Sequence, residues 1–180
     1  MKLVILDRDG VINEESDNFI KSPEEWIPIA GSLEAIAALN HAGFRVAIAT
    51  NLSALARELL SIDRLNAIHQ KMHRELESVG GHIDAIFFCP HGPNSHCDCR
   101  KPKPGMLQQI SKRFFTDLEG IPVIGDRMRD LQAAEAAGAT PILVRTGKGR
   151  ETEKECAAES TVAVYDNLSK AVEAILNQIQ

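Results

Sequence analysis

Aspartate residues follow two apolar segments of the chain. Asp7 and Asp9 come directly after residues 3–6, a short run with β-branched side chains that predicts a strand buried on both faces. Asp126 and Asp130 follow a second apolar run of the same kind. Beyond the carboxyl ends of strands in open α/β sheets, carboxylates can hold a hard cation, attack an electrophile or transfer a proton. The first pair alone would equally suit a solvated turn, so its interpretation depends on the rest of the chain.

Hydroxyl, amide and cationic side chains occur in the same kind of position. Thr50, Asn51 and Ser53 follow the apolar segment 45–49, while Arg100 and Lys101 precede Pro-Lys-Pro-Gly at the start of a predicted helix. Together with carboxylates that bind a divalent cation, such donors suit a phosphoryl group. We therefore expect the strand ends to form a site for phosphoryl chemistry.

Cysteine and histidine residues are clustered in one segment. Two close pairs of soft or borderline metal ligands lie there: Cys89 with His91, and Cys97 with Cys99. Such clustering with histidine favours a metal over disulfides. Four ligands of these types compose a closed tetrahedral zinc site with no position for water, so we expect residues 89–99, the zinc loop, to be structural. His96 could replace His91 as the fourth ligand, and unrelated cysteines in a loop are the plain alternative.

Length and composition are those of an ordinary globular protein. The 180 residues are 44% hydrophobic and 25% charged, which predicts one domain over residues 1–180 that buries about 70% of its unfolded surface. The net charge of −5 gives no reason to expect nucleic acid or an anionic membrane as a partner. No apolar stretch approaches the roughly 20 residues of a membrane span, and no secretory signal opens the chain. We therefore expect a cytoplasmic monomer that acts on a small molecule.

Apolar strand patterns alternate with helical ones along the chain. This alternation predicts an α/β fold: a Rossmann-like, mostly parallel sheet with helices on both faces. The expected strands are 3–6, 45–49, 83–88, 122–124, 142–144 and 161–164. The expected helices begin at Ser32, as a cap, and at Pro104, and cover 54–79, 129–137 and 168–179. Residues 13–26 and 147–159 are expected to be loops, and His69 and His73 to lie on a solvated helix face.

The order of these groups resembles the haloacid dehalogenase (HAD) superfamily of phosphatases over nearly the whole chain. Its four motifs match Asp7-Arg-Asp9-Gly-Val, Thr50, Lys101 and Gly125-Asp126-Arg-Met-Arg-Asp130. The resemblance implies that Asp7 attacks phosphorus to form an aspartyl-phosphate, while Asp9 protonates the leaving group and then activates water. It also implies that Thr50 and Lys101 stabilise the phosphoryl oxygens. Magnesium would be held by Asp7, Asp126 and the main-chain carbonyl of Asp9.

The superfamily's cap domains are inserted after the first motif or between the second and third, where this chain has no room, so a capless, open site is expected. A capless phosphatase with this zinc loop is similar to the D-glycero-D-manno-heptose-1,7-bisphosphate 7-phosphatases, which serve the activated heptose of lipopolysaccharide and other bacterial surface glycans. The similarity implies loss of the 7-phosphate from a sugar bisphosphate. It also implies substrate contacts from Asp17, Asn18, Asn51, Ser53, Arg100 and Arg127.

Two segments depart from that family's pattern, and other interpretations remain. Leu52 and Ala54 stand where the family has glutamine and glycine, and loop 16–20 is only loosely similar, which leaves sugar and anomer preference open. Histidinol-phosphate phosphatase shares the fold and a similar zinc loop. A phospho-accepting signalling domain also has aspartates, a threonine and a lysine at strand ends, but it needs no zinc loop.

Overall fold

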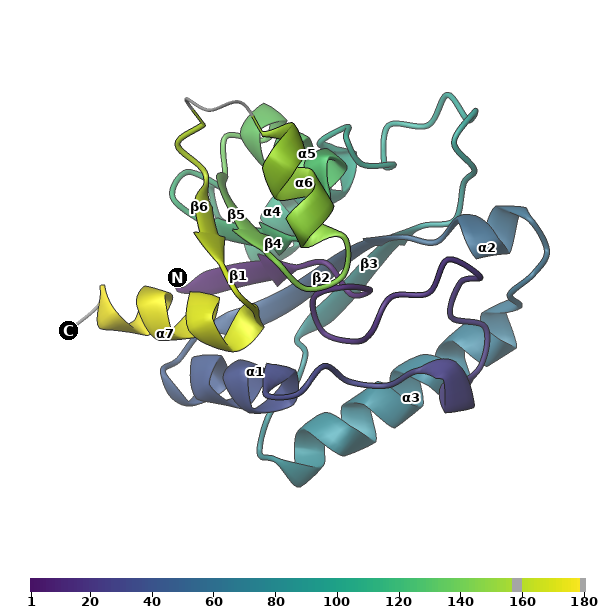
Figure 1. The fold of residues 1–180 in the computed structure, drawn as a ribbon, viewed down its shortest axis with the longest axis horizontal. Coiled ribbons are helices and arrows are strands. Elements are labelled where there is room, and N and C mark those ends of the chain that lie inside the picture. The colour runs from purple at the N-terminus through teal and green to yellow at the C-terminus, as the bar shows by residue number, and fades with distance from the viewer. Residues whose placement is uncertain (157–159, 179–180) are drawn as a thin grey trace.

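The computed structural model describes residues 1–156 and 160–178, which form one six-stranded sheet with helices packed on it. The spatial order of the strands is β3-β2-β1-β4-β5-β6, and every neighbouring pair is parallel. Figure 1 shows this arrangement. In chain order the strands are β1 (Leu3–Leu6), β2 (Arg45–Asn51), β3 (Ala85–Cys89), β4 (Pro122–Gly125), β5 (Thr140–Val144) and β6 (Ala163–Tyr165). The predicted fold class is confirmed.

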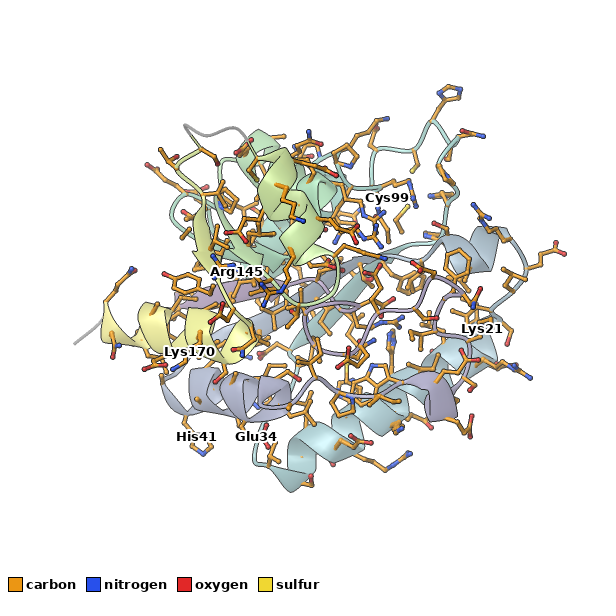
Figure 2. The ribbon with its side chains drawn as sticks, in the orientation of Figure 1. Lys21, Glu34, His41, Cys99, Arg145 and Lys170 are labelled. Atoms are coloured by element: carbon orange, nitrogen blue, oxygen red, sulfur yellow. The ribbon has the colours of Figure 1, made fainter. Side chains whose placement is uncertain are left out.

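Helices cover both faces of the sheet, as Figure 1 shows. Helices α1, α3 and α7 pack on one face, where α1 contacts both of the others, and α4 and α5 pack on the opposite face. In Figure 2, Cys99 lies on the opposite side of the sheet from Glu34 and His41 of α1. The helices are α1 (Ser32–His41), α2 (Ser53–Ala56), α3 (Ile62–Ser78), α4 (Gly105–Phe114), α5 (Met128–Ala136), α6 (Gly149–Glu155) and α7 (Leu168–Asn177), with a 3-10 turn, η1 (Pro23–Glu25).

Strand β1 is buried on both faces, as its continuous apolar run predicts. Val4 and Leu6 belong to the core under α1, α3 and α7, whereas Leu3 and Ile5 belong to the core under α4 and α5. Alternate side chains of a strand point to opposite faces, so a strand between two helical layers needs apolar residues at every position. The central strand is thereby fixed from both sides, and so is the direction in which its end points.

The segment 54–79 is not one helix, and this prediction was wrong. Helix α2 ends at Ala56 and α3 begins at Ile62, and Glu58 between them has a left-handed backbone with φ 56°. The Ser61 side chain then caps α3 by accepting the backbone N–H of Arg64. The apolar stripe itself is confirmed, because every one of its residues is buried: Leu65, Ile68, Met72 and Leu76.

Residues 147–159 also differ from the prediction of a loop. They contain α6, and residues 157–159 lie outside the described residues, as does Ile179 at the end of the predicted closing helix. Thr152 of α6 is 4% exposed and donates its hydroxyl to the main-chain oxygen of Asp126. The helix therefore has a tertiary anchor at the end of β4, which its polar sequence does not reveal.

The predicted cap of α1 also differs. Gly31 rather than Ser32 is the N-cap, and the Ser32 hydroxyl donates to the main-chain oxygen of Ile12.

Within the described part of the chain, no helix combines the length and the apolar composition that a membrane span requires.

Candidate active site

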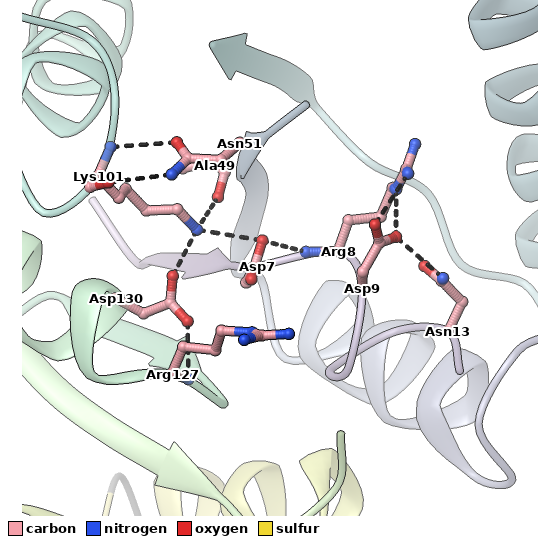
Figure 3. Close-up of polar contacts among 9 residues, drawn as sticks. All are labelled: Asp7, Arg8, Asp9, Asn13, Ala49, Asn51, Lys101, Arg127 and Asp130. Carbon is pink, nitrogen blue, oxygen red and sulfur yellow. Dashed lines mark hydrogen bonds and ion pairs between the residues drawn. The ribbon is translucent and has the colours of Figure 1, made fainter. Parts of the chain in front are cut away.

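The carboxyl ends of β1, β2 and β4 bring charged side chains together at one edge of the sheet. The Nζ atom of Lys101 lies 3.1 Å from Oδ1 of Asp7 and 2.6 Å from Oδ1 of Asp130, as Figure 3 shows. The same Nζ donates to the main-chain oxygen of Ala49 at 2.7 Å. All three ionic side chains are nearly fully buried. Residues far apart in the sequence thus form one compact charged cluster at the edge where the strands end, the expected place for a site in this kind of sheet.

Lys101 is held in this cluster through its backbone as well as its side chain. The Asn51 amide donates to the main-chain oxygen of Lys101 at 3.0 Å and accepts its N–H at 3.1 Å. Asn51, predicted to contact substrate, therefore has a structural partner on both ends of its amide. Lys101 lies just before α4, whose Met106 and Leu107 pack in the core. Its three acceptors, Asp130, Asp7 and Ala49, explain how a buried ammonium is tolerated, and the two carboxylates raise its pKa against the effect of burial.

Asp126 is packed directly against backbone from two other segments. Gly10 and Gly147 both have left-handed backbones, and a Cβ at either position would overlap the Asp126 carboxylate. Its Oδ2 accepts the backbone N–H of Lys148 at 2.8 Å, whereas Oδ1 is buried without a hydrogen-bond partner among the described residues. These two glycines are required by close approach as well as by backbone conformation. A buried carboxylate oxygen without a partner indicates a ligand that is not protein.

The carboxylates of this edge fit a divalent cation. Oxygens from Asp7, Asp126 and Asp130 all lie within 4.8 Å of one another. Burial is the main reason why the pKa of Asp7 is raised to about 6 and that of Asp126 to about 8, and the neighbouring carboxylates add to both shifts. A hard cation with oxygen preference would relieve both the desolvation and the repulsion. Asp7 and Asp126 were predicted as metal ligands, and the unpartnered Oδ1 of Asp126 makes it the clearest candidate.

Asp130 was noticed in the sequence as part of the fourth motif, but no role was predicted for it. Its carboxylate accepts the backbone N–H of Arg127 at 3.0 Å and pairs with Lys101 at 2.6 Å. The same carboxylate thus caps the start of α5 and holds the Lys101 side chain in place. The signal was its position at the third residue of a helix, where an acidic side chain commonly reaches back to the cap.

The Asp9 side chain points away from the charged cluster, and its surroundings favour the ionised carboxylate. Arg8 donates Nε to Oδ1 of Asp9 at 2.8 Å and Nη2 to Oδ2 at 3.2 Å, and Asn13 donates to Oδ1 at 3.0 Å (Figure 3). Burial opposes ionisation, but the charge and hydrogen bonds of Arg8 and the bond from Asn13 prevail and lower the pKa of Asp9. In this position Asp9 is a carboxylate.

A cleft opens above the cluster and contains most of the predicted substrate residues. Asp7, Asp9, Asp17, Thr50, Asn51, Ser53 and Arg127 line it, together with Glu15, Ser16, Phe19 and Arg129, which the sequence analysis did not single out. Arg127 donates to Glu15 across the cleft, and Lys148 pairs with Asp17 at 3.2 Å. Asn18 is exposed and does not line the cleft. The segment after β1 that contains Glu15 and Asp17 is thus connected by two ion pairs to the residues that precede α5 and α6.

The side chains of Leu52 and Ala54, where the chain departs from the family pattern, do not line the cleft. Leu52 is 4% exposed and Ala54 3% exposed, and both belong to the core under α1 and α3. Thr50, Asn51 and Ser53 are the residues of this segment that line the cleft. In this chain the two changed side chains contribute packing.

The four predicted zinc ligands come together with the spacing of a tetrahedral site. Cys89 Sγ lies 3.8 Å from Cys97 Sγ and 3.5 Å from His91 Nδ1, and Cys99 Sγ lies 3.3 Å from the same nitrogen. Two bonds of about 2.3 Å at a tetrahedral angle place sulfur atoms about 3.8 Å apart. All four ligand atoms lie within 4.8 Å of one another, and His96 is not in the group. The residues present therefore fit zinc, with His91 as the nitrogen ligand.

Residues that follow the zinc loop, on either side of Lys101, are hydrogen-bonded back to the loop. Arg100 donates Nη1 to the main-chain oxygen of His91 at 3.0 Å and to Oγ of Ser53 at 3.1 Å. Lys103 donates to the main-chain oxygen of Cys97 at 2.8 Å. The short segment 100–103, which contains Lys101, is therefore hydrogen-bonded to the zinc loop at both of its ends. Folding around a metal would restrain the position of that lysine.

Comparisons with known proteins agree with this geometry. The family profile for HAD-like hydrolases matches residues 98–171, and the profile for polynucleotide kinase 3 phosphatase matches residues 2–128. The chain is 53% identical to the D-glycero-β-D-manno-heptose-1,7-bisphosphate 7-phosphatase of Bordetella bronchiseptica over 99% of both chains, and 50% identical to that of Pseudomonas putida over 94% of this chain and 96% of the other.

Solved structures give the same result. The crystal structure of the B. bronchiseptica D,D-heptose 1,7-bisphosphate phosphatase with magnesium and phosphate has a TM-score of 0.96 and covers 99% of each chain. The corresponding enzyme of Burkholderia thailandensis is 44% identical, with a TM-score of 0.78 over 98% of this chain and 99% of the other. Fold and site together define a phosphatase of the HAD superfamily. Within it, the chain belongs to the D-glycero-β-D-manno-heptose-1,7-bisphosphate 7-phosphatase family of sugar bisphosphate phosphatases.

Magnesium binding is expected to depend steeply on pH. In the metal-free protein the pKa of Asp126 is about 8 and that of Asp7 about 6, so the cation must displace protons at lower pH. The apparent affinity for magnesium should fall about tenfold per pH unit below pH 8 and more steeply below pH 6.

The raised carboxyl pKa values also mean that the folding stability of the metal-free protein falls as pH rises through about 4 to 8.

Isothermal titration calorimetry with Mg²⁺ at pH 6, 7, 8 and 9 would measure this dependence. In Asp126→Asn the dependence between pH 7 and 9 should disappear along with much of the affinity. An affinity that is constant over this range in the wild-type protein would contradict the expectation.

Removing zinc is expected to lower phosphatase activity even with excess magnesium. The reason is mechanical, because the loop holds Arg100 and the segment that carries Lys101. Activity should be assayed before and after chelation, with zinc added back as the control for recovery. A zinc-free preparation that keeps full activity would show that the loop does not position these residues.

Proposed function

We propose that this chain removes the 7-phosphate of D-glycero-β-D-manno-heptose 1,7-bisphosphate through an aspartyl-phosphate intermediate. The observation that carries the mechanism is the 3.1 Å ion pair between Lys101 and Asp7 at the floor of the cleft. It orients a carboxylate toward the place where a phosphoryl group would lie and supplies positive charge beside it. The substrate follows from the family, whose Bordetella and Pseudomonas members carry that name.

Asp7 is well placed to be the nucleophile. Its Oδ1 already contacts Lys101 and accepts the backbone N–H of Arg8 at 2.8 Å, so Oδ2 is left for attack on phosphorus. Thr50, 2% exposed at the end of β2, lines the same cleft and offers a hydroxyl to a phosphoryl oxygen. These contacts fix the attacking group before substrate arrives, which is the main way a protein can accelerate phosphoryl transfer.

Magnesium would be held by Asp7, Asp126 and the main-chain oxygen of Asp9, the ligands predicted from the first and fourth motifs. When bound, it neutralises charge on the phosphoryl oxygens and on the attacking carboxylate. Asp130 lies within the same group of carboxylates, but its pairing with Lys101 and Arg127 makes it a support for the site. The zinc loop has no such open position and is proposed to be structural.

Asp9 would serve both steps by changing partner. The carboxylate bound by Arg8 and Asn13 is the form that takes a proton from water when the aspartyl-phosphate is hydrolysed. Protonating the leaving oxygen in the first step requires the side chain to leave Arg8 and take up a proton. Six residues are proposed to contact the sugar and its remaining phosphate: Asp17, Asn51, Ser53 and Arg127, which line the cleft, and Asn18 and Arg100, which do not.

Location and assembly are part of the proposal. Three cysteines must remain thiolates to hold zinc, which suits the reducing conditions of a bacterial cytoplasm. We expect the protein to act as a monomer on its small-molecule substrate. The product would enter the assembly of nucleotide-activated heptose for lipopolysaccharide.

The substitution Asp7→Asn is expected to reduce kcat by about a thousandfold or more, because an amide cannot form the acyl-phosphate. Phosphate release should be measured with saturating magnesium, with Asp117→Asn on the surface as the matched control. Circular dichroism would show that both variants remain folded. If Asp7→Asn keeps more than a tenth of wild-type kcat, the nucleophile is another residue.

The preferred substrate is expected to be the β anomer of the heptose bisphosphate. We expect its kcat/KM to exceed that for the α anomer, because the related enzymes are named for the β anomer. We expect it to exceed that for histidinol phosphate by at least tenfold, because cations near the cleft can bind the second phosphate, which histidinol phosphate lacks. Phosphorus NMR of the product should show that the 1-phosphate remains. Equal or higher activity on histidinol phosphate would assign the chain to the alternative function.

A further inference from the structure

Arg8 is a buried arginine in the middle of the first motif. Its side chain is 1% exposed, and two of its nitrogens form a fork on the carboxylate of Asp9. The remaining terminal nitrogen, Nη1, lies 3.2 Å from Nε2 of His69, which comes from α3. His69 was predicted to lie on a solvated helix face, and this prediction was wrong, because His69 is partly buried and contacts Arg8.

The contact determines the state of the His69 ring. A guanidinium has only donors, so Nε2 must accept and the ring proton must be on Nδ1. Burial, then the charge of Arg8 and the neighbouring His73, lowers the pKa of His69 to about 3, in agreement with a neutral acceptor. A buried N–H without an acceptor is costly, so His69 stabilises this one position of the guanidinium.

Helix α3 gives this contact a rigid base. Ile68 and Met72, on either side of His69 in the sequence, are fully buried in the core under the sheet. A side chain supported by a packed helix is positioned more exactly than one on a loop. Arg8 is therefore held between a strand end and a helix, and the fork that receives Asp9 has a fixed location.

We infer that His69 is a positioning residue of the phosphatase reaction, which acts by holding Arg8 where the Asp9 carboxylate docks between its two proton transfers. The inference rests on the proposed acid/base role of Asp9. His69 itself does not line the cleft. Its loss would let Arg8 move and would change where Asp9 rests and how readily it turns to the leaving group.

Substitution of His69 should change kcat and leave KM nearly unchanged. We expect His69→Leu to lower kcat by about tenfold or more, since small displacements of a catalytic group have effects of this size. His69→Gln keeps an acceptor and should recover most of the loss. His73→Leu, one turn further along α3, is the matched control and should behave like the wild type. If His69→Leu does not fold, His69→Met replaces it as the variant without a strong acceptor.

A double-mutant cycle with Asp9→Asn separates positioning from general destabilisation. If His69 acts through Arg8 on Asp9, adding His69→Leu to Asp9→Asn should cause no further loss of kcat. A loss of the same size in both backgrounds, or an effect on KM alone, would overturn the inference. Wild-type activity in Asp9→Asn would instead refute the acid/base role. A strong effect of Asp9→Asn with none from His69→Leu would refute only the role of His69.

Discussion

The ion pairs of Lys101 with Asp7 and Asp130 are the interaction on which the rest of the site depends. A buried ammonium is costly unless it is fully paired, and here it has two carboxylates and a main-chain oxygen. Three separate structural features serve this arrangement: the amide of Asn51, the start of α4 and the cap of α5 by Asp130. The same contacts that stabilise the lysine also orient the nucleophile, so stability and reactivity have one origin.

The three carboxylates at this edge outnumber the buried cation beside them, Lys101, and that imbalance favours binding of a metal ion. Lys101 is shared by Asp7 and Asp130, while Asp126 has only a backbone N–H on one oxygen. Burial raises the pKa of Asp126 to about 8, so ionisation of this carboxyl at neutral pH is opposed until positive charge arrives. Gly10 and Gly147 press the backbone against it and leave little space for it to turn away. The fold therefore leaves negative charge of the buried carboxylates uncompensated at the position where a divalent cation would bind.

Much of this could be predicted from the sequence because the signals are local and strong. Strand β1 is apolar at every position, and Asp7, Lys101 and the zinc ligands each belong to a short motif with a chemical reason. The remaining features depend on tertiary contacts that no local pattern encodes. Helix α6 is polar and owes its anchor to Asp126, whereas α2 and α3 are separated by a residue in the left-handed region. His69 was expected to be solvated because polar residues follow it in the sequence, and only packing shows Arg8 beside it.

The pairing of Arg8 with Asp9 agrees with different proposed tasks for two aspartates that are separated by one residue. In the proposed mechanism Asp7 attacks from a fixed position, and its contacts with Lys101 and a backbone N–H hold it there. Asp9 would change both its proton and its direction, so the mechanism needs a partner that binds the carboxylate and then releases it. The fork comes from a buried arginine, but the Asp9 side chain is 26% exposed and the Asp7 side chain only 7%. This difference in exposure agrees with the proposed roles, in which Asp7 is a fixed nucleophile and Asp9 a proton carrier that turns toward the substrate.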